Sequence, residues 1–285
     1  MPVVPPTLGH KQERAAKLHV EPDWIDFHDV APGRVRIEVA VHNRGEVPSK
    51  PQTIRLQAAS IGAHTPWQPL TPVRLPAILP RRTLTIATEV LRAQPSQRSS
   101  NLSVLRNAAH MARRLDRIPN LPLLWKRACK ESVITEPWAR TLPLDPFELL
   151  GKKSPHWTGG IRVQIDSQTQ TSRSRAQALR FAPGKTNMLL FCVGDEPDRF
   201  LFEFQGKAAR WSPSLMVASE TYAKEIEASE LHLPSSTPMV LRFTPPGDAQ
   251  EGDLFIRVRS KSKKTTETIE LNLNANAPGP GSFLA

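Results

Sequence analysis

The sequence predicts an all-β protein built from two β-sandwiches, the first of which carries a partly helical, basic insertion. Three observations lead to this prediction. Short runs of alternating apolar and polar residues recur about every 8–12 residues, which is typical of sandwich strands. The 28 prolines among 285 residues leave little room for helices or central strands, because proline lacks the amide hydrogen that both need. One turn-and-strand pattern also repeats 151 residues further along the chain.

Two folded domains fit a length of 285 residues, since a domain averages about 150 residues. We place the first domain at residues 17–168 and the second at residues 176–275. The polar run between them, 167–175, is expected to be the joint or else an exposed hairpin. Residues 1–16 and 276–285 have no apolar period and are predicted to be flexible tails.

The first domain opens with two short extended pieces in Lys17–Phe27, which are split at Pro22-Asp23. After a Pro32-Gly33 turn, every second residue from Val35 to Val41 is apolar, which predicts a half-buried strand. Asn43-Arg44-Gly45 supplies the next turn, because Asn and Gly both tolerate a positive φ. The further strands expected in this domain are Thr53–Ala58, Val73–Leu75 and Thr83–Val90.

Residues 93–155 interrupt the strand pattern and hold eleven Lys or Arg against five Asp or Glu, which is +6 of the net charge of +11. Ser103 can cap an amphipathic helix. Its apolar positions, spaced three or four apart, are Val104, Ala108, Met111 or Ala112, and Leu115. Alternation resumes in Trp157–Asp166, and we expect this strand to return to the first sheet. Residues 93–155 are therefore predicted to be an insertion between two strands of one domain.

The repeat aligns the turn Ala31-Pro32-Gly33-Arg34 with Ala182-Pro183-Gly184-Lys185. It also aligns Cys192 with Val41, so Cys192 is expected to face the second core as a small hydrophobe. Because the other cysteine, Cys129, lies in the insertion, we expect two unpaired thiols and no disulfide. The strands expected in the second domain are Ala178–Phe181, Thr186–Val193, Phe200–Phe204, Leu215–Ala218, Glu230–Leu233, Met239–Phe243, Leu254–Arg259 and Thr268–Leu273.

The first half resembles the cell-adhesion-related domain of bacteria (CARDB). The resemblance rests on the run Leu18–Gly45, with its Pro-Gly turn and Val-x-Val-x-Asn-x-Gly, and on Val73–Pro80 before a Thr-rich strand. The segment Pro22–Phe27 is similar to the start of hydin-type domains, and Trp157–Asp166 looks like the final CARDB strand.

The second half is similar to the immunoglobulin-like domains appended to bacterial secreted glycosidases and surface proteins. The matching pieces are Ala182-Pro183-Gly184, Asp195-Glu196, Trp211 and Phe243–Gly252. Together the two resemblances imply two immunoglobulin-like β-sandwich domains in a bacterial, non-enzymatic module of adhesion, spacing or assembly.

No motif for catalysis or cofactor binding is found: the sequence has no Gly-rich phosphate loop and no HExxH, GxSxG, CxxC or EF-hand spacing. We therefore predict no catalytic residues, no cofactor and no metal site. The carboxylates that could hold Ca²⁺ are Glu21, Asp23, Asp26 and Asp29. Strand alternation would send Asp23 and Asp26 to opposite faces, which argues against a shared ion. Asp195, Glu196 and Asp198 are ordinary turn residues.

The sequence favours a non-enzymatic module that binds a protein or a cell-envelope component through its loops and the insertion. The alternative is an anionic polymer, a nucleic acid or a membrane surface bound by the basic residues of the insertion. Leu121, Leu123 and Leu124 place apolar surface beside this charge, which favours a protein partner but also suits a membrane interface. The candidate partner-binding residues are Arg106, Arg113, Arg114, Arg117, Trp125, Lys126 and Arg127.

The compartment is predicted from three weaker features. The first residues lack the basic start and the continuous apolar stretch of a secretory signal. No apolar run reaches the ~18 residues of a transmembrane segment. With thiols expected to be free, a cytoplasmic location is slightly favoured over export to the cell envelope. The oligomeric state is left open.

Overall fold

The computed structural model describes residues 15–31, 33–92, 141–142, 158–166, 169–218, 223–226, 230–235 and 237–277. Across these residues the protein is all-β, so the predicted fold class is confirmed at that level. The helical turns in this part of the chain are η1 (Pro22–Trp24) and η3 (Lys207–Arg210), both of 3-10 type. No helix within these ranges has the length and the apolar character needed to cross a membrane. Apart from Thr141–Leu142, the predicted insertion and its helix lie outside the described residues.

The first sheet, here called the N-terminal sheet, is centred on β3 (Arg34–Asn43). Strand β8 (Thr83–Arg92) pairs along one side of β3. Along the other side lie β1 (Leu18–His19) and β2 (Ile25–Ala31), which η1 separates. The short β9 (Thr141–Leu142) runs parallel to the end of β8. The four inward positions predicted for β3 are confirmed as buried: Val35, Ile37, Val39 and Val41.

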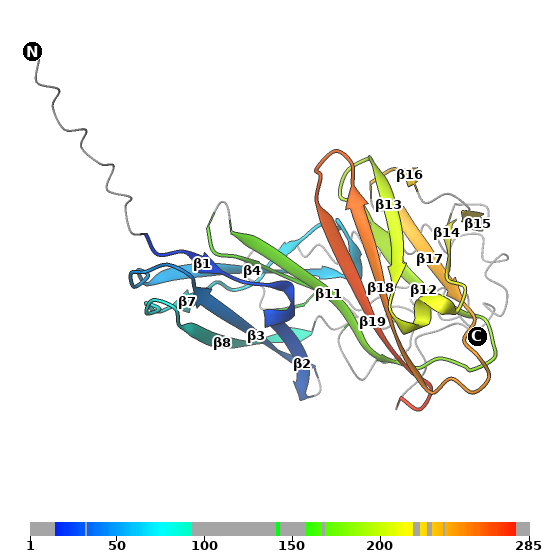
Figure 1. Cartoon of the computed structure of the whole chain (residues 1–285), viewed down its shortest axis with the longest axis horizontal. Coiled ribbons are helices and arrows are strands. Elements are labelled where there is room, and N and C mark those ends of the chain that lie inside the picture. Colours follow the sequence, from blue (N-terminus) through cyan, green and yellow to red (C-terminus); the bar gives the residue numbers. More distant parts are fainter. Residues whose placement is uncertain are drawn as a thin grey trace, which may run out of the picture.

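The second sheet, here called the shared sheet, has nine strands and runs through both halves of the molecule (Figure 1). Its order is β16 (Glu230–Leu233), β13 (Asp198–Gln205), β18 (Glu251–Ser260), β19 (Thr266–Asn274), β11 (Gln170–Leu179), β10 (Gly159–Gln164), β4 (Gln52–Ser60) and β6 (Gln68–Pro69), with β7 (Val73–Leu75) also on β4. The Ile161 strand, β10, was expected to return to the first sheet; it pairs with β4 of the first half, but within the shared sheet rather than the N-terminal sheet.

The third sheet, here called the C-terminal sheet, takes its last strand from the first half of the chain. Its order is β15 (Ala223–Ile226), β14 (Ser214–Ala218), β17 (Thr237–Phe243), β12 (Asn187–Val193) and β5 (Gly62–Ala63). Strand β5 runs parallel to β12, with Gly62 opposite Cys192. A Cβ on Gly62 would lie 2.2 Å from the Cys192 carbonyl oxygen, so this approach requires glycine.

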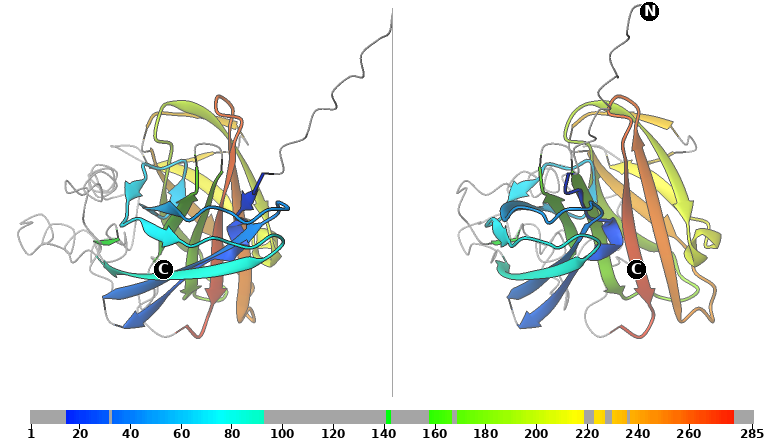
Figure 2. Two further views of the ribbon diagram at one scale, coloured as in Figure 1. Left: turned by 90° about the vertical axis from the view of Figure 1, so that its left-hand side faces the viewer. Right: turned by 60° about the vertical axis from the view of Figure 1, so that its left-hand side comes forward.

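Two hydrophobic cores lie on opposite faces of the shared sheet. The N-terminal core includes Ile161, whose cross-strand partner on β11 is Arg173. The C-terminal core includes Ile269, whose partner on β11 is the next residue, Ser174. Successive residues of a strand point to opposite faces, so the two cores lie on opposite faces of the shared sheet. The N-terminal sheet packs on one face of the shared sheet, and the C-terminal sheet packs on the other face, towards the opposite end (Figure 2).

Of the two alternatives expected for residues 167–175, the interdomain joint is wrong and the hairpin is confirmed, because β11 begins at Gln170 and pairs antiparallel with β10. This strand pairs with β10 from Gln170 to Arg175 and with β19 from Ser174 onward. A strand with a different core against each face at each end has no single buried face. It therefore lacks the period-two alternation on which the prediction of strands relied.

The expectation for Cys192 is also corrected. Leu189, Phe191 and Val193 face the C-terminal core, so Cys192 points to the other face, although it is buried. The repeat was aligned one residue out of phase, and a slip of one residue reverses the face of every side chain. Cys192 is disulfide-bonded, not a free thiol. The other cysteine of the sequence, Cys129, lies outside the described residues. Since disulfides persist in oxidising compartments, the slight preference for the cytoplasm loses the one of its three features that rested on free thiols.

Candidate functional site

The partner-binding residues predicted from sequence all lie outside the described residues. They are Arg106, Arg113, Arg114, Arg117, Trp125, Lys126 and Arg127. The polar features described below lie on the described strands, most of them at residues that the sequence analysis did not single out.

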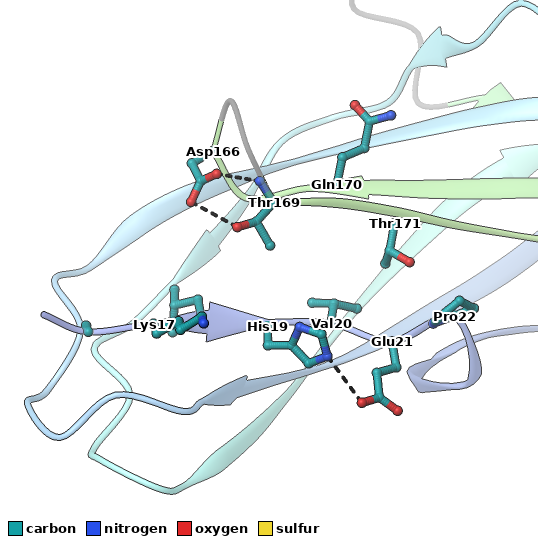
Figure 3. A pocket seen from close by; sticks show the side chains of 11 residues that line it. Lys17, His19, Val20, Glu21, Pro22, Asp166, Thr169, Gln170 and Thr171 are labelled. Atoms are coloured by element: carbon teal, nitrogen blue, oxygen red, sulfur yellow. Dashed lines mark hydrogen bonds and ion pairs between the residues drawn. The ribbon is translucent and has the colours of Figure 1, made fainter. Parts of the chain in front are cut away.

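A cavity of about 570 Å³, here called the edge cavity, opens at the margin of the N-terminal core (Figure 3). One wall is the continuous stretch 16–22, which contains β1 and the start of η1. The opposite wall is the β10–β11 hairpin, through Asp166 and residues 169–171. The cavity thus lies between the edge of the N-terminal sheet and the part of the shared sheet that β19 does not reach.

The position of the β1 wall depends on Asn43, a buried residue at the end of β3. Its Oδ1 accepts hydrogen bonds from the main-chain N–H groups of Lys17 (3.2 Å) and Gly45 (2.9 Å). Its Nδ2 donates to the carbonyl oxygens of Val47 (2.8 Å) and Ile78 (3.0 Å). One amide therefore ties the start of β1 to the turn after β3. This is a structural role for the Asn-x-Gly turn that the sequence had indicated.

The hairpin wall is shaped by Asp166. Its Oδ1 accepts a hydrogen bond from the Thr169 N–H at 2.6 Å, and its Oδ2 accepts one from the Thr169 hydroxyl at 3.2 Å. These contacts close the turn between β10 and β11 through the side chain of an Asp residue. Thr171 then points towards β1, while Gln170 points away from it (Figure 3).

The side chains around the edge cavity are polar and of mixed charge. Glu21 accepts hydrogen bonds from Arg44 (2.8 Å) and shares a contact with His19 (3.2 Å) through the same Oε1 atom. Lys17 lines the cavity from the same stretch of chain. Such a lining can exchange hydrogen bonds with a polar ligand, whereas an apolar ligand would strip water from the Glu21 and Asp166 carboxylates.

The four carboxylates weighed as calcium ligands do not form one cluster. Glu21 faces the edge cavity, whereas Asp26 contacts Arg175 on β11 at 2.5 Å. Asp23 is highly exposed and lies in η1 rather than in a strand. Within the described ranges, no group of three or more His, Cys, Asp or Glu side chains could hold a metal ion.

The electrostatics of Asp26 reflect its role between the halves. Burial acts to raise its pKa, but the hydrogen bond and the charge of Arg175, together with the Phe27 N–H, outweigh this effect. The pKa of Asp26 is therefore held below its ordinary value. Arg175 also donates to the Phe27 carbonyl oxygen at 2.9 Å, and its guanidinium lies 4.8 Å from the centre of the Phe27 ring.

Two ion pairs, here called the junction pairs, join β10 and β11 to β19. On the face of the N-terminal core, Arg173 binds Glu270 with Nε–O distances of 3.0 Å and an Nη2–Oε2 distance of 2.7 Å. On the opposite face, Arg162 binds Glu267 at 3.1 Å. All four side chains are 12–18% exposed. The buried charges of this region are therefore used to connect the two halves.

Trp67 covers the Arg162 pair, with the guanidinium 4.2 Å from the centre of the indole ring. The ring also fills the space above Gly160, where a Cβ would lie 2.8 Å from it. Burial lowers the pKa of Arg162 from its ordinary value, while the Glu267 carboxylate opposes that shift. Glu267 accepts a further hydrogen bond from the His64 N–H at 2.6 Å, which links the pair to the turn after β5.

The turn carboxylates of the second half have structural partners. Asp198 accepts hydrogen bonds from the hydroxyls of Ser260 and Ser262. Although desolvation raises its pKa, these bonds and two main-chain N–H groups lower the pKa to about 2. Asp195 binds the Lys263 ammonium group at 2.7 Å. Asp195 and Asp198 therefore hold the turn between β18 and β19 in place.

Sequence reasoning missed both the edge cavity and the junction pairs. The residues that matter most, Arg173 and Arg175, lay in the polar run interpreted as a joint. One signal could have identified them: Arg173 and Arg175 occupy alternate positions soon after the strand Trp157–Asp166, which is the spacing of two side chains on one face of a second strand. Comparison with known proteins adds no assignment, because no family model and no curated protein sequence matches the chain.

Proposed function

We propose that this protein is a non-enzymatic, bacterial, immunoglobulin-like adhesion or assembly module that binds a protein or cell-envelope partner. It would consist of two sandwich domains, near residues 17–168 and 176–275, that meet at β11. The proposal takes its family from the CARDB-like and immunoglobulin-like sequence patterns. Its geometry comes from the way in which the two halves are joined.

The observation that supports the proposal best is the shared sheet. Main-chain pairing between β11 and β19 and between β5 and β12 connects the two cores at two places. Side chains reinforce both faces of the connection through the junction pairs. Binding surfaces need supporting elements that hold them in a fixed geometry, and this connection would hold the loops and edges of both halves in register.

The charges buried in this region also favour a scaffold over a reaction centre. A buried ion pair is weak evidence for net stability, because desolvation opposes the attraction between the charges. Its best-attested effect is to specify one arrangement of packed elements. The Arg162–Glu267 pair joins β10 to β19, and the Arg173–Glu270 pair joins β11 to β19. Ion pairs that connect the two halves in this way are what a rigid two-domain module would need.

The alternative function, binding of a polyanion or an anionic membrane through residues 93–155, is favoured by the concentration of basic residues there. Neutralising six to ten phosphates would make the affinity fall about 10³- to 10⁵-fold between ~50 and ~200 mM salt. A protein partner docked on a surface of mixed polarity would respond far less.

The experiment that separates the two functions measures retention of the full-length protein on heparin and on phosphatidylserine vesicles at physiological salt. The proposed function predicts little retention and no change when Arg113, Arg114 and Arg117 are replaced together by Ala. Strong retention that the triple variant loses would reject the proposed function in favour of the alternative. A matched control is the replacement of Arg34, Arg55 and Arg74 by Ala, which removes the same charge from described strands.

A further inference from the structure

The edge cavity lies between two strand edges whose main-chain groups are free among the described residues. The N-terminal half of β11 pairs with β10 only, because its pairing with β19 starts at Ser174. Strand β1 pairs with β3 on one side and with no described strand on the other. An unpaired edge presents a row of N–H and C=O groups that can template another strand.

The hydrogen bonds of the hairpin establish which groups of β11 face outward. The Ile165 N–H donates to the Thr169 carbonyl oxygen at 3.0 Å. Hydrogen-bonded positions alternate along an antiparallel ladder, so Thr171 and Arg173 direct their main-chain groups to β10. Gln170 and Ser172 therefore direct theirs away from β10, and the same alternation aims those of Ser174 at β19, as its pairing requires.

The same reasoning applies to β1. The Arg44 N–H donates to the Lys17 carbonyl oxygen at 2.7 Å, so Lys17 and His19 face β3. Leu18 and Val20 then direct their main-chain groups towards the cavity that both residues line. Leu18 and Val20 on one side and Gln170 on the other thus direct outward main-chain groups at the margin of the cavity that all three residues line.

Further along this margin of the N-terminal sheet, arginine side chains close the edge. Arg173 donates to the Ile25 carbonyl oxygen at 3.1 Å, and Arg175 donates to that of Phe27 at 2.9 Å. Among the described side chains, none makes the equivalent contact with Leu18 or Val20. The open section of the margin therefore coincides with the edge cavity.

We propose that the edge cavity accepts an extended strand of a partner protein, which adds to the open edge of β11 through main-chain hydrogen bonds. This inference rests on the proposed function and names its binding mode. A volume of about 570 Å³ falls within the ~300–1,000 Å³ usual for ligand sites. The polar, mixed-charge lining, which includes Lys17, His19 and Glu21, suits a strand with polar side chains that can exchange hydrogen bonds with it.

The test begins with a random heptapeptide library displayed on phage, panned against the immobilised full-length protein. Peptides that bind are synthesised, and their affinities are measured by calorimetry. Gln170→Pro removes one outward N–H at the first residue of a strand, a position where proline is tolerated. We expect it to weaken binding about tenfold. Gln170→Ala keeps the N–H and is the matched control, which should bind as the wild type does.

A second measurement needs no protein variant. In each selected peptide, single residues are N-methylated in turn. Methylation at every second residue should abolish binding to the wild-type protein, whereas methylation at the intervening residues should have little effect, because an added strand directs alternate N–H groups to its neighbour. This result does not depend on the folding of any variant.

The remaining outcomes decide against the proposal in different ways. Polar peptides that bind wild type and Gln170→Pro equally would overturn the edge cavity as their site but leave the proposed function intact. A library that yields no peptide, together with strong retention on heparin, would overturn both. Self-association that Gln170→Pro abolishes would assign the cavity to a second copy of this chain. Peptides that bind only after removal of residues 1–14 would assign it to the chain's own N-terminal tail.

Discussion

Replacing Arg173 by methionine should lower the free energy of unfolding by up to about 3–5 kcal/mol, the cost of breaking a buried ion pair, because it leaves a largely buried carboxylate without its partner. Arg173 and Glu270 are 15% and 12% exposed, and their shortest contact is 2.7 Å. Arg173 also donates to the Ile25 carbonyl oxygen, so the variant loses a contact with the N-terminal sheet as well. Methionine retains the length and the apolar surface of the arginine stem, so the loss reports mainly on the charge.

The matched control is Arg34→Met, which removes a surface ion pair. Arg34 and Glu89 are 59% and 48% exposed and lie 3.8 Å apart. Exposed pairs of this kind contribute about 0.2–1 kcal/mol. Urea unfolding of the two variants, followed by circular dichroism and tryptophan fluorescence, measures the difference directly.

A second substitution tests the cause of the loss. Adding Glu270→Leu to Arg173→Met removes the unpaired carboxylate and should restore at least half of the lost stability, since apolar replacements of buried pairs are often neutral. The reasoning is refuted if Arg173→Met is no less stable than Arg34→Met, or if the double variant is less stable than Arg173→Met.

Three other predictions follow from single residues. Gly62→Ala should lower the free energy of unfolding by about 1–3 kcal/mol, because the added methyl group forces β5 away from β12. Gly247→Ala is the control: nothing lies within 4 Å of a Cβ at this position, so the midpoint of urea unfolding should change little. The pKa of Asp198 is lowered to about 2 in the folded protein, so the ionised side chain stabilises the fold at any pH above the pKa that it has in the unfolded chain. This contribution is lost as the pH falls from about 4 to about 2, and the difference in melting temperature between wild type and Asp198→Asn should disappear over that range. Cys192 should resist alkylation in denaturant until a reductant is added, and alkylation without reduction would contradict its disulfide.

The sequence predicted best those strands that bury one face against a single core and leave the other face exposed. In β3, Val35 to Val41 alternate because the strand packs against the N-terminal core on one side and meets solvent on the other. In β12 the sequence predicted a strand but not which face of it is buried, because Leu189 to Val193 are all apolar or cysteine. The structure places Leu189, Phe191 and Val193 inward.

The sequence did not predict how the halves join, because that depends on contacts between residues far apart in the chain. Strand β5 is two residues long, and its pairing with β12 spans about 130 positions of sequence, far beyond any local pattern. The polar character of β11 likewise reflects Glu270, Asp26 and main-chain carbonyls that approach only in the folded protein. The edge cavity was not predictable for the same reason: it exists where β19 diverges from β11.

The central claim is that β11 belongs to both halves and keeps an open edge at its start. Residue-resolved amide hydrogen exchange of the native protein tests both parts in one strand. We predict slow exchange at Ser174 and Ala176, whose N–H groups point to β19, and fast exchange at Gln170 and Ser172, whose N–H groups point away from β10 before the pairing with β19 begins. Fast exchange at Ser174 and Ala176 would contradict the shared sheet, and slow exchange at Gln170 and Ser172 would contradict the open edge.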